Sequence, residues 1–448
     1  MAAAQPQAEN ESTQEKTGLG NYFIANYPPF SFWKPAHVPD ALAALDRPPV
    51  PGTPLGLYLH IPFCRKRCKF CYFRVYTDKN ARDVETYLTA ITKEIELLSR
   101  TACVGGRQVD YVYIGGGTPS YLSATQLRGL FEGVQRHLPW DAAREVAFEC
   151  EPGTLQQHKL QTLKDLGVTR LSLGIENFSD AILESNGRAH LSAEIYRAYG
   201  WAREVGFDQI NIDLIAGMVG ETWENWKDCV RKTIELSPES VTVYQMELPY
   251  NTRYSKELTV LGQEAAPAEM IADWPTKRAW VEYAFAEFRN NGYEVSSAYT
   301  VVKDKSKTQF VYRDALWRGA DMFGTGVASF GHVNGVHVQN VDTWEAYTGM
   351  LERGELPIGR ALPVTDRQRL IREMILQLKT GHLDAGYFRA KFDADIATEF
   401  RDGYRKLEAE GWLKVTPTGV DLTPAGFLQI DRHLPAFFEP QHVSTRYA

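Results

Sequence analysis

The chain has 448 residues, more than one hydrophobic core usually serves, so we expect one large domain and one smaller domain. Its composition, 44% hydrophobic and 23% charged, is that of an ordinary globular protein, and a formal net charge of -7 argues against general nucleic-acid binding. No apolar run approaches the roughly 20 residues that cross a bilayer, and six cysteines are too sparse for a disulfide scaffold. We therefore expect a cytoplasmic protein without membrane insertion and without a nucleic-acid partner.

The N-terminal residues divide into two parts. Residues 1–20 are polar and carry glutamates where a targeting peptide would need basic and apolar stretches, so we expect a disordered tail. Residues 21–54 hold an aromatic, proline-bearing stretch from Tyr22 to Trp33, followed by a linker-like run. Because so many aromatic side chains are costly to leave in water, this segment is expected to pack against the next domain as a wall or lid.

Residues 55–360 alternate short β-rich runs with amphipathic helical patterns. Strands are predicted at 57–61, 109–114, 145–149, 169–175, 209–215 and 240–246. Helices are predicted between them, including 84–100, 124–137, 193–205 and 222–236. This alternation predicts right-handed βαβ units around a parallel sheet. Polar and glycine-rich signals follow nearly every strand, where a barrel collects its active site, which favours a partial (β/α)6 TIM-type barrel over an open doubly wound sheet.

Residues 361–448 change to helices with a short hairpin. Thr365 and Gln368 form a capping box ahead of an amphipathic helix, and a second helix is predicted over Ile396–Glu410. Trp412–Thr416 and Val420–Thr423 are predicted to pair as the strands of a wing. The pattern indicates a winged-helix-like domain. Its acidic character favours a structural or lid role over DNA contact.

Three cysteines lie together directly after the first predicted strand, as Cys64, Cys68 and Cys71. Thiolates are soft ligands that suit iron-sulfur clusters, and three of them leave one iron without a protein ligand. A structural zinc site would need a fourth ligand, and the nearest candidate, His60, ends a strand and is expected to turn away. The remaining cysteines are expected to be buried small hydrophobes: Cys103, Cys150 and Cys229.

Further signals follow the second and later strands. Gly115–Gly117 end the second strand, and without side chains they let the backbone approach a ligand closely. They lack the last glycine of a dinucleotide fingerprint, which argues against a nicotinamide site. Glu149, at the end of the third strand, can accept hydrogen bonds from a ligand, or it can be a solvated loop group.

The chain resembles the radical S-adenosylmethionine (SAM) superfamily, specifically the oxygen-independent coproporphyrinogen III oxidase-like family. The likeness extends from about Tyr22 into the C-terminal domain. Relatives in this family include a heme chaperone and the class C radical methyltransferases. The motifs that carry the resemblance are Tyr58-Leu-His-Ile-Pro-Phe-Cys64 with Cys68 and Cys71, Gly115-Gly-Gly-Thr-Pro-Ser120, Glu149, Arg170-Leu-Ser-Leu-Gly-Ile175, Gly187-Arg188-x-His190 and Asn211-x-Asp213-Leu-Ile-x-Gly217.

The resemblance implies a 4Fe-4S cluster on the three cysteines and reductive cleavage of SAM to a 5'-deoxyadenosyl radical. It also implies a second SAM molecule beside the first, a porphyrin-like or other aromatic substrate, and a flavodoxin or ferredoxin-type electron donor. Glu176 and Tyr58 are implied as catalytic. The implied cofactor-binding residues are Tyr58, Phe70, Gly116, Gly117, Thr118, Glu149, Glu176, Arg188 and Asp213. For Tyr58 and Phe70 the alternative role is plain packing. For Arg188 and Asp213 the alternative is a surface ion pair.

The chain departs from the oxidase pattern beside the expected reaction centre. It has Glu176 where that oxidase has glutamine, and Tyr72-Phe73 where it has glycine and cysteine. A carboxylate favours a cation or acts as a base, which glutamine does not. The reaction therefore stays open between oxidative decarboxylation and radical C-methylation or alkylation.

Two functions without catalysis are weighed beside the enzyme. A heme-binding chaperone that retains the cluster is the main alternative, and a DNA-binding iron or oxygen sensor is the weakest. The aromatic segment from Tyr22 to Trp33 favours an enzyme with a covered pocket, whereas Glu151-Pro-Gly-Thr154 leans toward the chaperone and methyltransferase branches. The basic residues Arg65, Lys66, Arg67 and Lys69 either attract an acidic electron donor or form a solvated loop.

Overall fold

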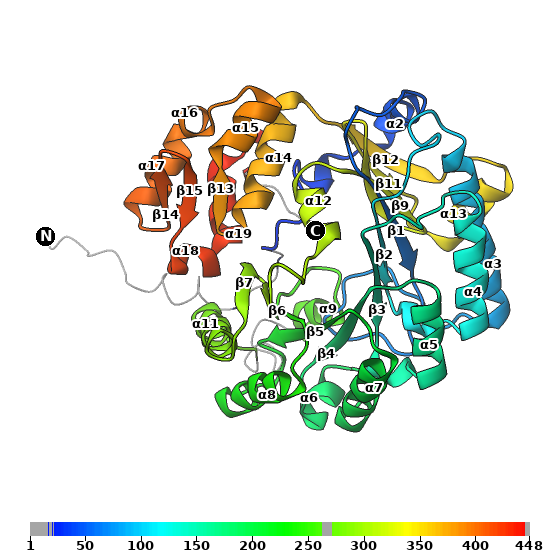
Figure 1. The fold of residues 1–448 in the computed structure, drawn as a ribbon, viewed down its shortest axis with the longest axis horizontal. Coiled ribbons are helices and arrows are strands. Elements are labelled where there is room, and N and C mark those ends of the chain that lie inside the picture. The colour runs from blue at the N-terminus through cyan, green and yellow to red at the C-terminus, as the bar shows by residue number, and fades with distance from the viewer. Residues whose placement is uncertain (1–16, 18–19, 21, 262–270, 444–448) are drawn as a thin grey trace, which may run out of the picture.

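The computed structural model describes residues 17, 20, 22–261 and 271–443. Within these residues a curved twelve-stranded sheet carries helices on its outer face, and a smaller helical domain with a three-stranded sheet lies at the open side of the curve (Figure 1). The predicted disordered tail, apart from residues 17 and 20, lies outside the described residues. None of the helices described is long and apolar enough to cross a membrane.

Six parallel strands form the centre of the large sheet, as predicted. They pair in chain order, and most of their residues are buried, as expected for parallel strands covered on both faces. Strand β2 ends two residues later than predicted, so Gly116 still belongs to it. The strands are β1 (Leu55–Ile61), β2 (Tyr111–Gly116), β3 (Glu145–Cys150), β4 (Arg170–Glu176), β5 (Gln209–Ala216) and β6 (Ser240–Gln245).

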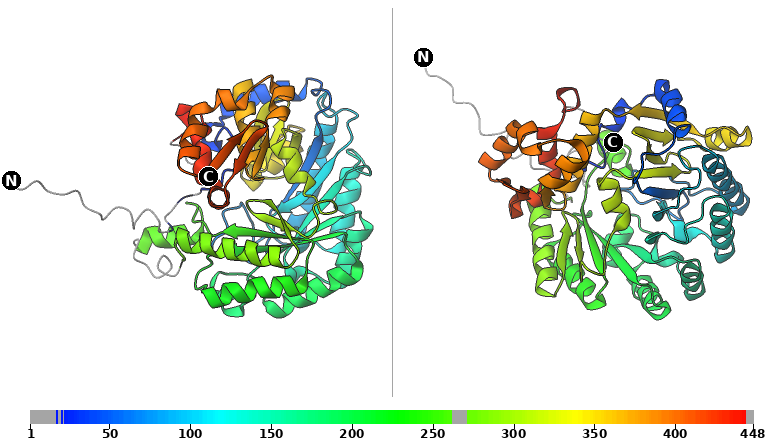
Figure 2. Two further views of the ribbon diagram at one scale, coloured as in Figure 1. Left: turned by 60° about the vertical axis from the view of Figure 1, so that its left-hand side comes forward. Right: turned by 45° about the horizontal axis from the view of Figure 1, so that its top comes forward.

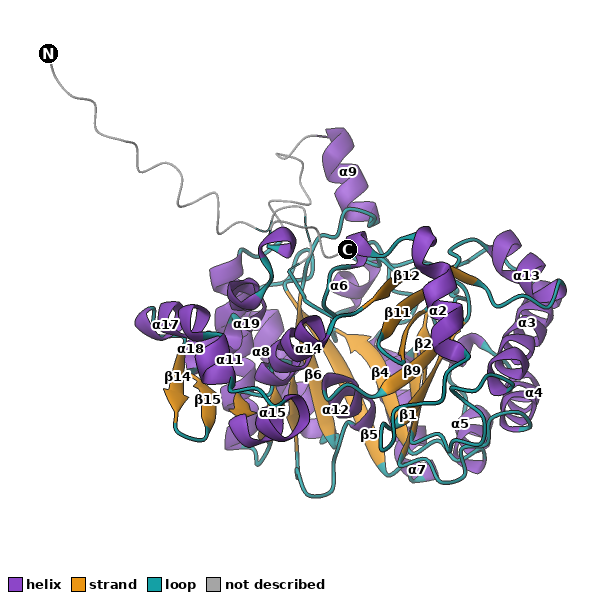
Figure 3. Ribbon diagram, turned by 90° about the horizontal axis from the view of Figure 1, so that it is seen from above, coloured by secondary structure: helices purple, strands orange, loops and turns teal. Residues whose placement is uncertain are grey.

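Amphipathic helices cover the convex face of this sheet (Figure 3). Their apolar sides join the main hydrophobic core, and capping boxes begin two of them, at Asn80 with Asp83 and at Ser123 with Gln126. The helices are α3 (Ala81–Ser99), α4 (Ala124–Gln135), α5 (Gln157–Asp165), α6 (Asp180–Ser185), α7 (Ser192–Val205) and α8 (Trp223–Leu236).

The sheet continues at both edges without closing. Beyond β1 lie β9 (Asp321–Thr325), parallel to β1, and then the antiparallel strands β10 (Phe330–Val333), β11 (Val336–Asn340) and β12 (Ile358–Pro363). Beyond β6 lie β8 (Thr300–Val302) and β7 (Glu294–Ser297). These short edge strands were not predicted. The barrel is therefore partial, with its gap between β12 and β7.

Further helices connect the edge strands: α9 (Arg253–Leu261), α11 (Trp274–Asn290), α12 (Val311–Trp317) and α13 (Trp344–Glu352). Helix α2 (Val38–Leu45) precedes β1 and packs on β11 and β12. Single turns of 3-10 helix occur at Phe30–Phe32, Pro35–His37, Pro119–Tyr121, Pro152–Thr154, Leu434–Phe437 and Pro440–His442.

The C-terminal domain has its own hydrophobic core. The predicted helix over Ile396–Glu410 is wrong as one element, because Phe400 breaks it (φ -112°, ψ 24°) and directs its ring toward Tyr404 and Phe437 in that core. The wing has a third strand that was not predicted. The elements are α14 (Asp366–Leu378), β13 (His382–Asp384), α15 (Ala385–Phe392), α16 (Ile396–Glu399), α17 (Arg401–Ala409), β14 (Leu413–Thr416), β15 (Gly419–Leu422), α18 (Pro424–Leu428) and α19 (Ile430–His433).

The aromatic N-terminal segment packs against the barrel, as expected, and also against the C-terminal domain. Ile24 and Tyr27 belong to the C-terminal core, whereas the Trp33 ring stacks on His337 of β11 with centroids 4.9 Å apart. Lys379 of the C-terminal domain donates to the Ile24 carbonyl, and Asp431 accepts from the Ile24 N–H at 2.9 Å. The segment therefore joins the two domains across the gap in the barrel (Figure 2).

Replacing Trp33 by alanine tests whether the N-terminal segment stabilises the protein by packing between the two domains. Trp33 is 2% exposed, so its loss is expected to lower the free energy of unfolding by about 3–5 kcal/mol, as for other buried tryptophans. Denaturant unfolding followed by circular dichroism measures the change. Leu42→Ala on the exposed face of α2 is the control and should change stability by less than about 0.5 kcal/mol. Equal effects of the two substitutions would contradict the packing role of the segment.

Candidate active site

A cavity of about 440 Å³ lies at the carboxyl ends of the parallel strands. Its walls come from the loop after β1, the ends of β2 to β6, the N-terminal segment at Tyr22 and Phe23, and residues 427–432 of the C-terminal domain. A barrel gathers functional groups from successive strands at this end. The cavity is therefore the candidate active site.

The three clustered cysteines all line this cavity. The Cys64 Sγ lies 3.3 Å from the Thr118 hydroxyl, and the Cys68 Sγ accepts from Arg188 Nη1 at 3.4 Å. Burial raises the pKa of the Cys64 thiol to about 11 and that of Cys71 to about 12. Burial thus favours the protonated form of Cys64 and Cys71 in the absence of a metal, and metal binding would release their protons.

The surroundings of the cysteine loop fit an iron-sulfur cluster, which gives each thiolate its own iron. Gly117 makes room beside the loop, because a Cβ there would lie 3.0 Å from the Cys64 Sγ, and Arg188 and Thr118 offer donors to the sulfurs.

His60 and Tyr58 lie on β1, directly before the cysteine loop. The His60 ring is 3.1 Å from the Tyr58 hydroxyl and 3.4 Å from the Arg74 backbone carbonyl. The Tyr58 ring lies beside that of Tyr113, and its catalytic and cofactor-binding roles stay predictions. Phe70 lines the cavity.

Glu149 reaches the cavity from the end of β3. It accepts hydrogen bonds from the Tyr113 hydroxyl at 2.7 Å and from the Gly116 N–H at 3.1 Å. Burial raises the pKa of Glu149 to about 7, and the nearby Asp213 contributes. Glu149 is therefore held in place, rather than being a solvated loop group.

Glu176 enters the cavity through a bulge in β4. The register of β4 against β5 shifts between Gly174 and Glu176, and Glu176 has a φ of +67°, which is uncommon for a residue other than glycine. Burial raises the pKa of Glu176 to about 7, against the lowering effect of Arg188. Strained backbone of this kind tends to occur at functional sites.

Arg188 connects the cysteine loop with the carboxyl groups. Its Nη1 donates to Cys68 Sγ, and its Nη2 donates to the Gly174 carbonyl and lies 3.6 Å from Glu176 Oε1. Asp213, on β5, accepts from the Ser172 hydroxyl at 2.8 Å and from Asn211 at 2.9 Å, and burial raises its pKa. Both residues line the cavity, so the simple surface pair weighed for them is wrong.

The structure brings the predicted glycine-rich motif to the same cavity. Gly116, Gly117 and Thr118 line it beside the cysteines, and Gly116 has a φ of +115°. A Cβ on Gly116 would lie 2.6 Å from the His60 ring, so glycine is required for both its backbone angle and its surroundings. The roles of these residues toward a cofactor stay predictions.

Several cavity residues were missed by sequence reasoning. Tyr299 and Trp274 come from the unpredicted end of the sheet and its flanking helix, and Phe427–Arg432 come from the C-terminal domain. Neither group lies in a motif, and only the fold brings them to the cavity. Arg65 pairs with Glu151, a contact that the sequence did not reveal, and the attraction of an acidic electron donor by the basic loop stays a prediction.

Comparisons with known proteins agree with this geometry. Residues 58–233 match the model of the radical SAM superfamily, and residues 364–428 match the HemN C-terminal domain. The oxygen-independent coproporphyrinogen III oxidase of Synechocystis is 28% identical over 408 residues, 86% of this chain and 85% of that protein. The heme chaperone HemW of Bacillus subtilis is 29% identical over 380 residues, 83% of this chain and 96% of that protein. The fold and the cysteine loop are those of a radical SAM protein.

Coproporphyrinogen III oxidase (HemN) of Escherichia coli, a solved radical SAM enzyme, shares the fold. It superposes with a TM-score of 0.80 at 24% identity, covering 93% of this chain and 96% of that one. The chain belongs to the HemN-like family of the radical SAM superfamily. That membership implies a 4Fe-4S cluster and SAM as cofactors. The oxidase and the chaperone have about the same sequence identity to the chain, so identity alone does not distinguish their functions.

The raised pKa values predict how the apo-protein responds to pH. Because Glu149 binds its proton more tightly in the folded chain, the folded state holds more protons than the unfolded state between about pH 4.5 and 7. Its contribution to stability is therefore present at low pH and is lost as pH rises to about 7. Glu149→Gln should gain stability relative to wild type by about 1–3 kcal/mol between pH 5 and pH 8.

Denaturant unfolding of the metal-free protein at a series of pH values measures this difference. Glu132→Gln on the exposed face of α4 is the control and should follow the wild-type profile. A Glu149→Gln profile parallel to wild type would contradict a buried, proton-binding carboxyl group.

Proposed function

We propose that this protein is a radical SAM enzyme that holds a 4Fe-4S cluster on Cys64, Cys68 and Cys71 and acts on a planar, conjugated substrate of the porphyrin type. The observation that carries this proposal is one cavity that holds the three clustered thiols, the carboxyl groups at the ends of β3, β4 and β5, and an aromatic wall. When bound, the cluster supplies the electron that cleaves SAM, whose adenosyl group then takes a hydrogen atom from the substrate.

The charge of the cavity supports binding of SAM. A sulfonium and an ammonium group are both positive, and Glu149, Glu176 and Asp213 offer them negative charge inside the barrel. Arg188 offers a guanidinium to a carboxylate, the geometry that bidentate recognition uses. Several carboxyl groups in one cavity suit more than one cationic ligand, so we propose that two SAM molecules bind.

Backbone groups support the placement of the methionine end. Gly116 and Gly117 line the cavity next to the cysteines without side chains, so a ligand can approach their backbone closely. Their N–H groups are already bonded, to Glu149 and to the Ile61 carbonyl. Thr118, whose hydroxyl faces Cys64, lies beside them. Together these residues would orient the cofactor and exclude water from one side of it.

The aromatic wall supports a conjugated substrate. Tyr22, Tyr72, Phe73 and Tyr244 are 40–44% exposed, although all four line the cavity. Tyr72 and Phe73 stack with centroids 4.5 Å apart directly after the last cysteine. Exposed aromatic faces inside a cavity favour a flat, apolar ligand, which stacks on them.

Glu176 supports transfer of carbon to the substrate over decarboxylation. Its pKa of about 7 lets it take up and release a proton near neutral pH, which the glutamine of the oxidase pattern cannot do. Methylation or alkylation of an sp2 carbon requires a proton to leave that carbon. We therefore propose Glu176 as the base in a radical C-methylation or alkylation.

A heme chaperone is the second candidate, because the HemW relative aligns over 96% of its own length. The cavity favours the enzyme. Tyr22 and Phe23 cover it from one side and residues 427–432 from another, which would shield a reactive radical from water. The test compares substrate turnover with stable heme uptake in the absence of turnover.

Cys68→Ala should abolish both the cluster and cofactor cleavage, because only two of the three iron ligands remain. The measurement is iron content and 5'-deoxyadenosine formation after anaerobic reconstitution and reduction. Cys229→Ala, which removes a buried cysteine of α8, is the matched control and should retain both. Cofactor cleavage by the Cys68 variant at the wild-type rate would refute the ligand assignment.

Glu176→Gln should change the products rather than the cluster. With porphyrin-type substrates offered, wild type is expected to form S-adenosylhomocysteine together with 5'-deoxyadenosine, the mark of methyl transfer. The variant should lose alkylated product at least about 10-fold, as expected when a general base is removed. An unchanged product distribution, or carbon dioxide from coproporphyrinogen with wild type, would contradict the alkylation proposal.

A further inference from the structure

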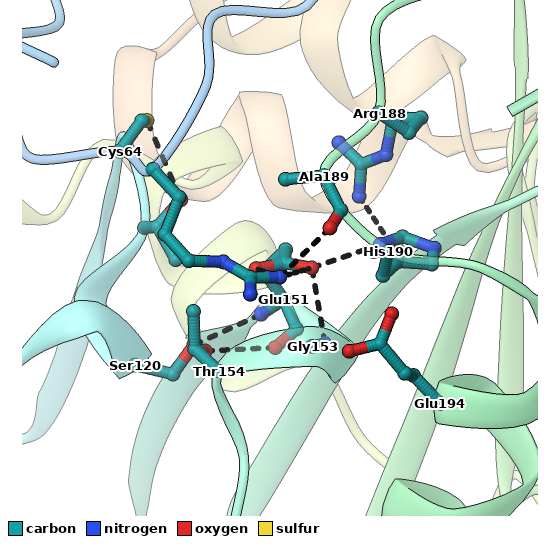
Figure 4. A network of polar contacts seen from close by, with 12 residues as sticks. Cys64, Ser120, Glu151, Gly153, Thr154, Arg188, Ala189, His190 and Glu194 are labelled. Atoms are coloured by element: carbon teal, nitrogen blue, oxygen red, sulfur yellow. Dashed lines mark hydrogen bonds and ion pairs between the residues drawn. The ribbon is translucent and has the colours of Figure 1, made fainter. Parts of the chain in front are cut away.

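We propose that Glu151 is a positioning residue that fixes the cysteine loop and the Arg188 segment in one geometry. This inference rests on the proposed cluster site. Glu151 follows β3 as the first residue of the Glu-Pro-Gly-Thr motif and is 8% exposed. Glu151 lines the cavity, and Figure 4 shows its carboxylate at the centre of a polar network.

The first arm of the network reaches the cysteine loop. Arg65 directly follows Cys64, and its Nη2 donates to both carboxylate oxygens of Glu151, at 3.1 and 3.0 Å. The same nitrogen donates to the Ala189 carbonyl at 2.9 Å. One guanidinium nitrogen therefore joins the cysteine loop to the end of β3 and to the residue after Arg188.

The second arm reaches the Arg188 segment. His190 Nδ1 lies 3.0 Å from Glu151 Oε1, and His190 Nε2 lies 3.3 Å from the Ile175 carbonyl, next to Glu176. The His190 side chain is fully buried in this position. The network thus holds both Ala189 and His190 in place. Because these residues directly follow Arg188, they fix the backbone from which the Arg188 side chain extends to Cys68.

The surroundings of Gly153 provide independent evidence that the Arg65 guanidinium belongs beside Glu151. A Cβ at Gly153 would lie 2.0 Å from Arg65 Nη2, so the absence of a side chain leaves the channel for the guanidinium. The Gly153 N–H also donates to Glu151 Oε1 at 3.0 Å. The backbone N–H of Glu151 is in turn held by the Ser120 hydroxyl at 2.9 Å, which anchors the network to the end of β2.

The consequence is a coupling between two parts of the site. Cys64 and Cys68 stand on either side of Arg65 in the loop, and Arg188 contacts Cys68 Sγ at 3.4 Å. Glu151 touches neither sulfur in the structure, so it acts through Arg65 and His190. Residues of this kind, which orient metal ligands without binding the metal, typically change metal affinity 10–100-fold when they are removed.

The experiment compares Glu151→Ala, Arg65→Gln and Gly153→Ala with wild type. Gly153→Ala is the sharpest variant, because it displaces the guanidinium while both charges remain. The first readout uses the apo-protein: alkylation of Cys64 and Cys68, located by mass spectrometry, should be at least about 3-fold faster in all three variants because the loop is released. The Glu151→Ala, Arg65→Gln double variant should react no faster than either single variant, since both act on one interaction.

The second readout uses the reconstituted protein. Iron retained during a chelator challenge should fall at least about 10-fold in Glu151→Ala. At equal iron content, the change that SAM causes in the electron paramagnetic resonance spectrum of the reduced cluster should be smaller, since Arg188 is no longer aligned. Glu151→Asp should recover part of both effects.

Two control variants separate positioning from general charge and stability. Glu194→Gln removes a neighbouring acid that caps α7 through the Leu191 N–H, and Lys66→Gln removes a positive charge from the cysteine loop. Both should match wild type in thiol reactivity. If the Glu151 variants also match wild type in thiol reactivity and iron retention while only their melting temperature falls, the network is an ordinary ion pair and the inference is overturned. Failure of wild type to bind iron would instead refute the proposed function, because the apo-protein readout tests positioning alone.

Discussion

The carboxyl ends of parallel strands meet at one edge of the sheet, and this constraint decides where all the chemistry of the protein lies. The loop with the three cysteines leaves β1 at that edge, and the glycines of β2, Glu149 of β3, Glu176 of β4 and Asp213 of β5 arrive at the same edge. Residues separated by more than 100 positions in the chain thereby line one cavity. A cluster on this loop would therefore face the groups that can hold a cationic cofactor.

Buried charge is the main cost of this arrangement. Glu176 is buried and Glu149 and Asp213 are partly buried, and burial raises the pKa of all three. Asp213 raises the pKa of the two glutamates further, and Arg188 lies 3.6 Å from Glu176. Glu176 additionally holds a backbone angle with φ of +67°. Such an arrangement gains little for stability, but it suits a ligand that brings positive charge. The buried carboxyl groups and the strained backbone of Glu176 are unfavourable in the apo-protein, and both are expected of a site that binds a cationic ligand.

The sequence predicts most of the barrel because its signals are local. Alternating strands and helices, the cysteine spacing and the glycines after β2 each depend on neighbouring residues, and the structure has all of them. The edge strands β7 to β12 were missed because they are short, and all but β9 pair antiparallel to their neighbours. The break at Phe400 was missed because it comes from burial of that ring, which a helical pattern does not reveal.

The site was predictable only in part, for the same reason. Glu149 and Arg188 lie in motifs, whereas Tyr299 reaches the cavity from the turn between β7 and β8, and Asp431 reaches it through the packing of the C-terminal domain on the barrel. Tyr58 lies in the strongest motif, yet the contacts of its ring are with His60 and Tyr113. Arg65 looked like part of a basic loop, and only its distance from Glu151 shows that it is tied to the fold.

Three thiols on a 4Fe-4S cluster leave one iron open for SAM. Electron-nuclear double resonance on the reduced, reconstituted protein, with SAM labelled by 15N in its amino group, tests this directly. We expect a hyperfine coupling between the label and the cluster, which requires the amino group to bind iron. A reduced cluster that shows no such coupling in the presence of saturating SAM, or a purified protein whose thiols hold zinc, would contradict this expectation.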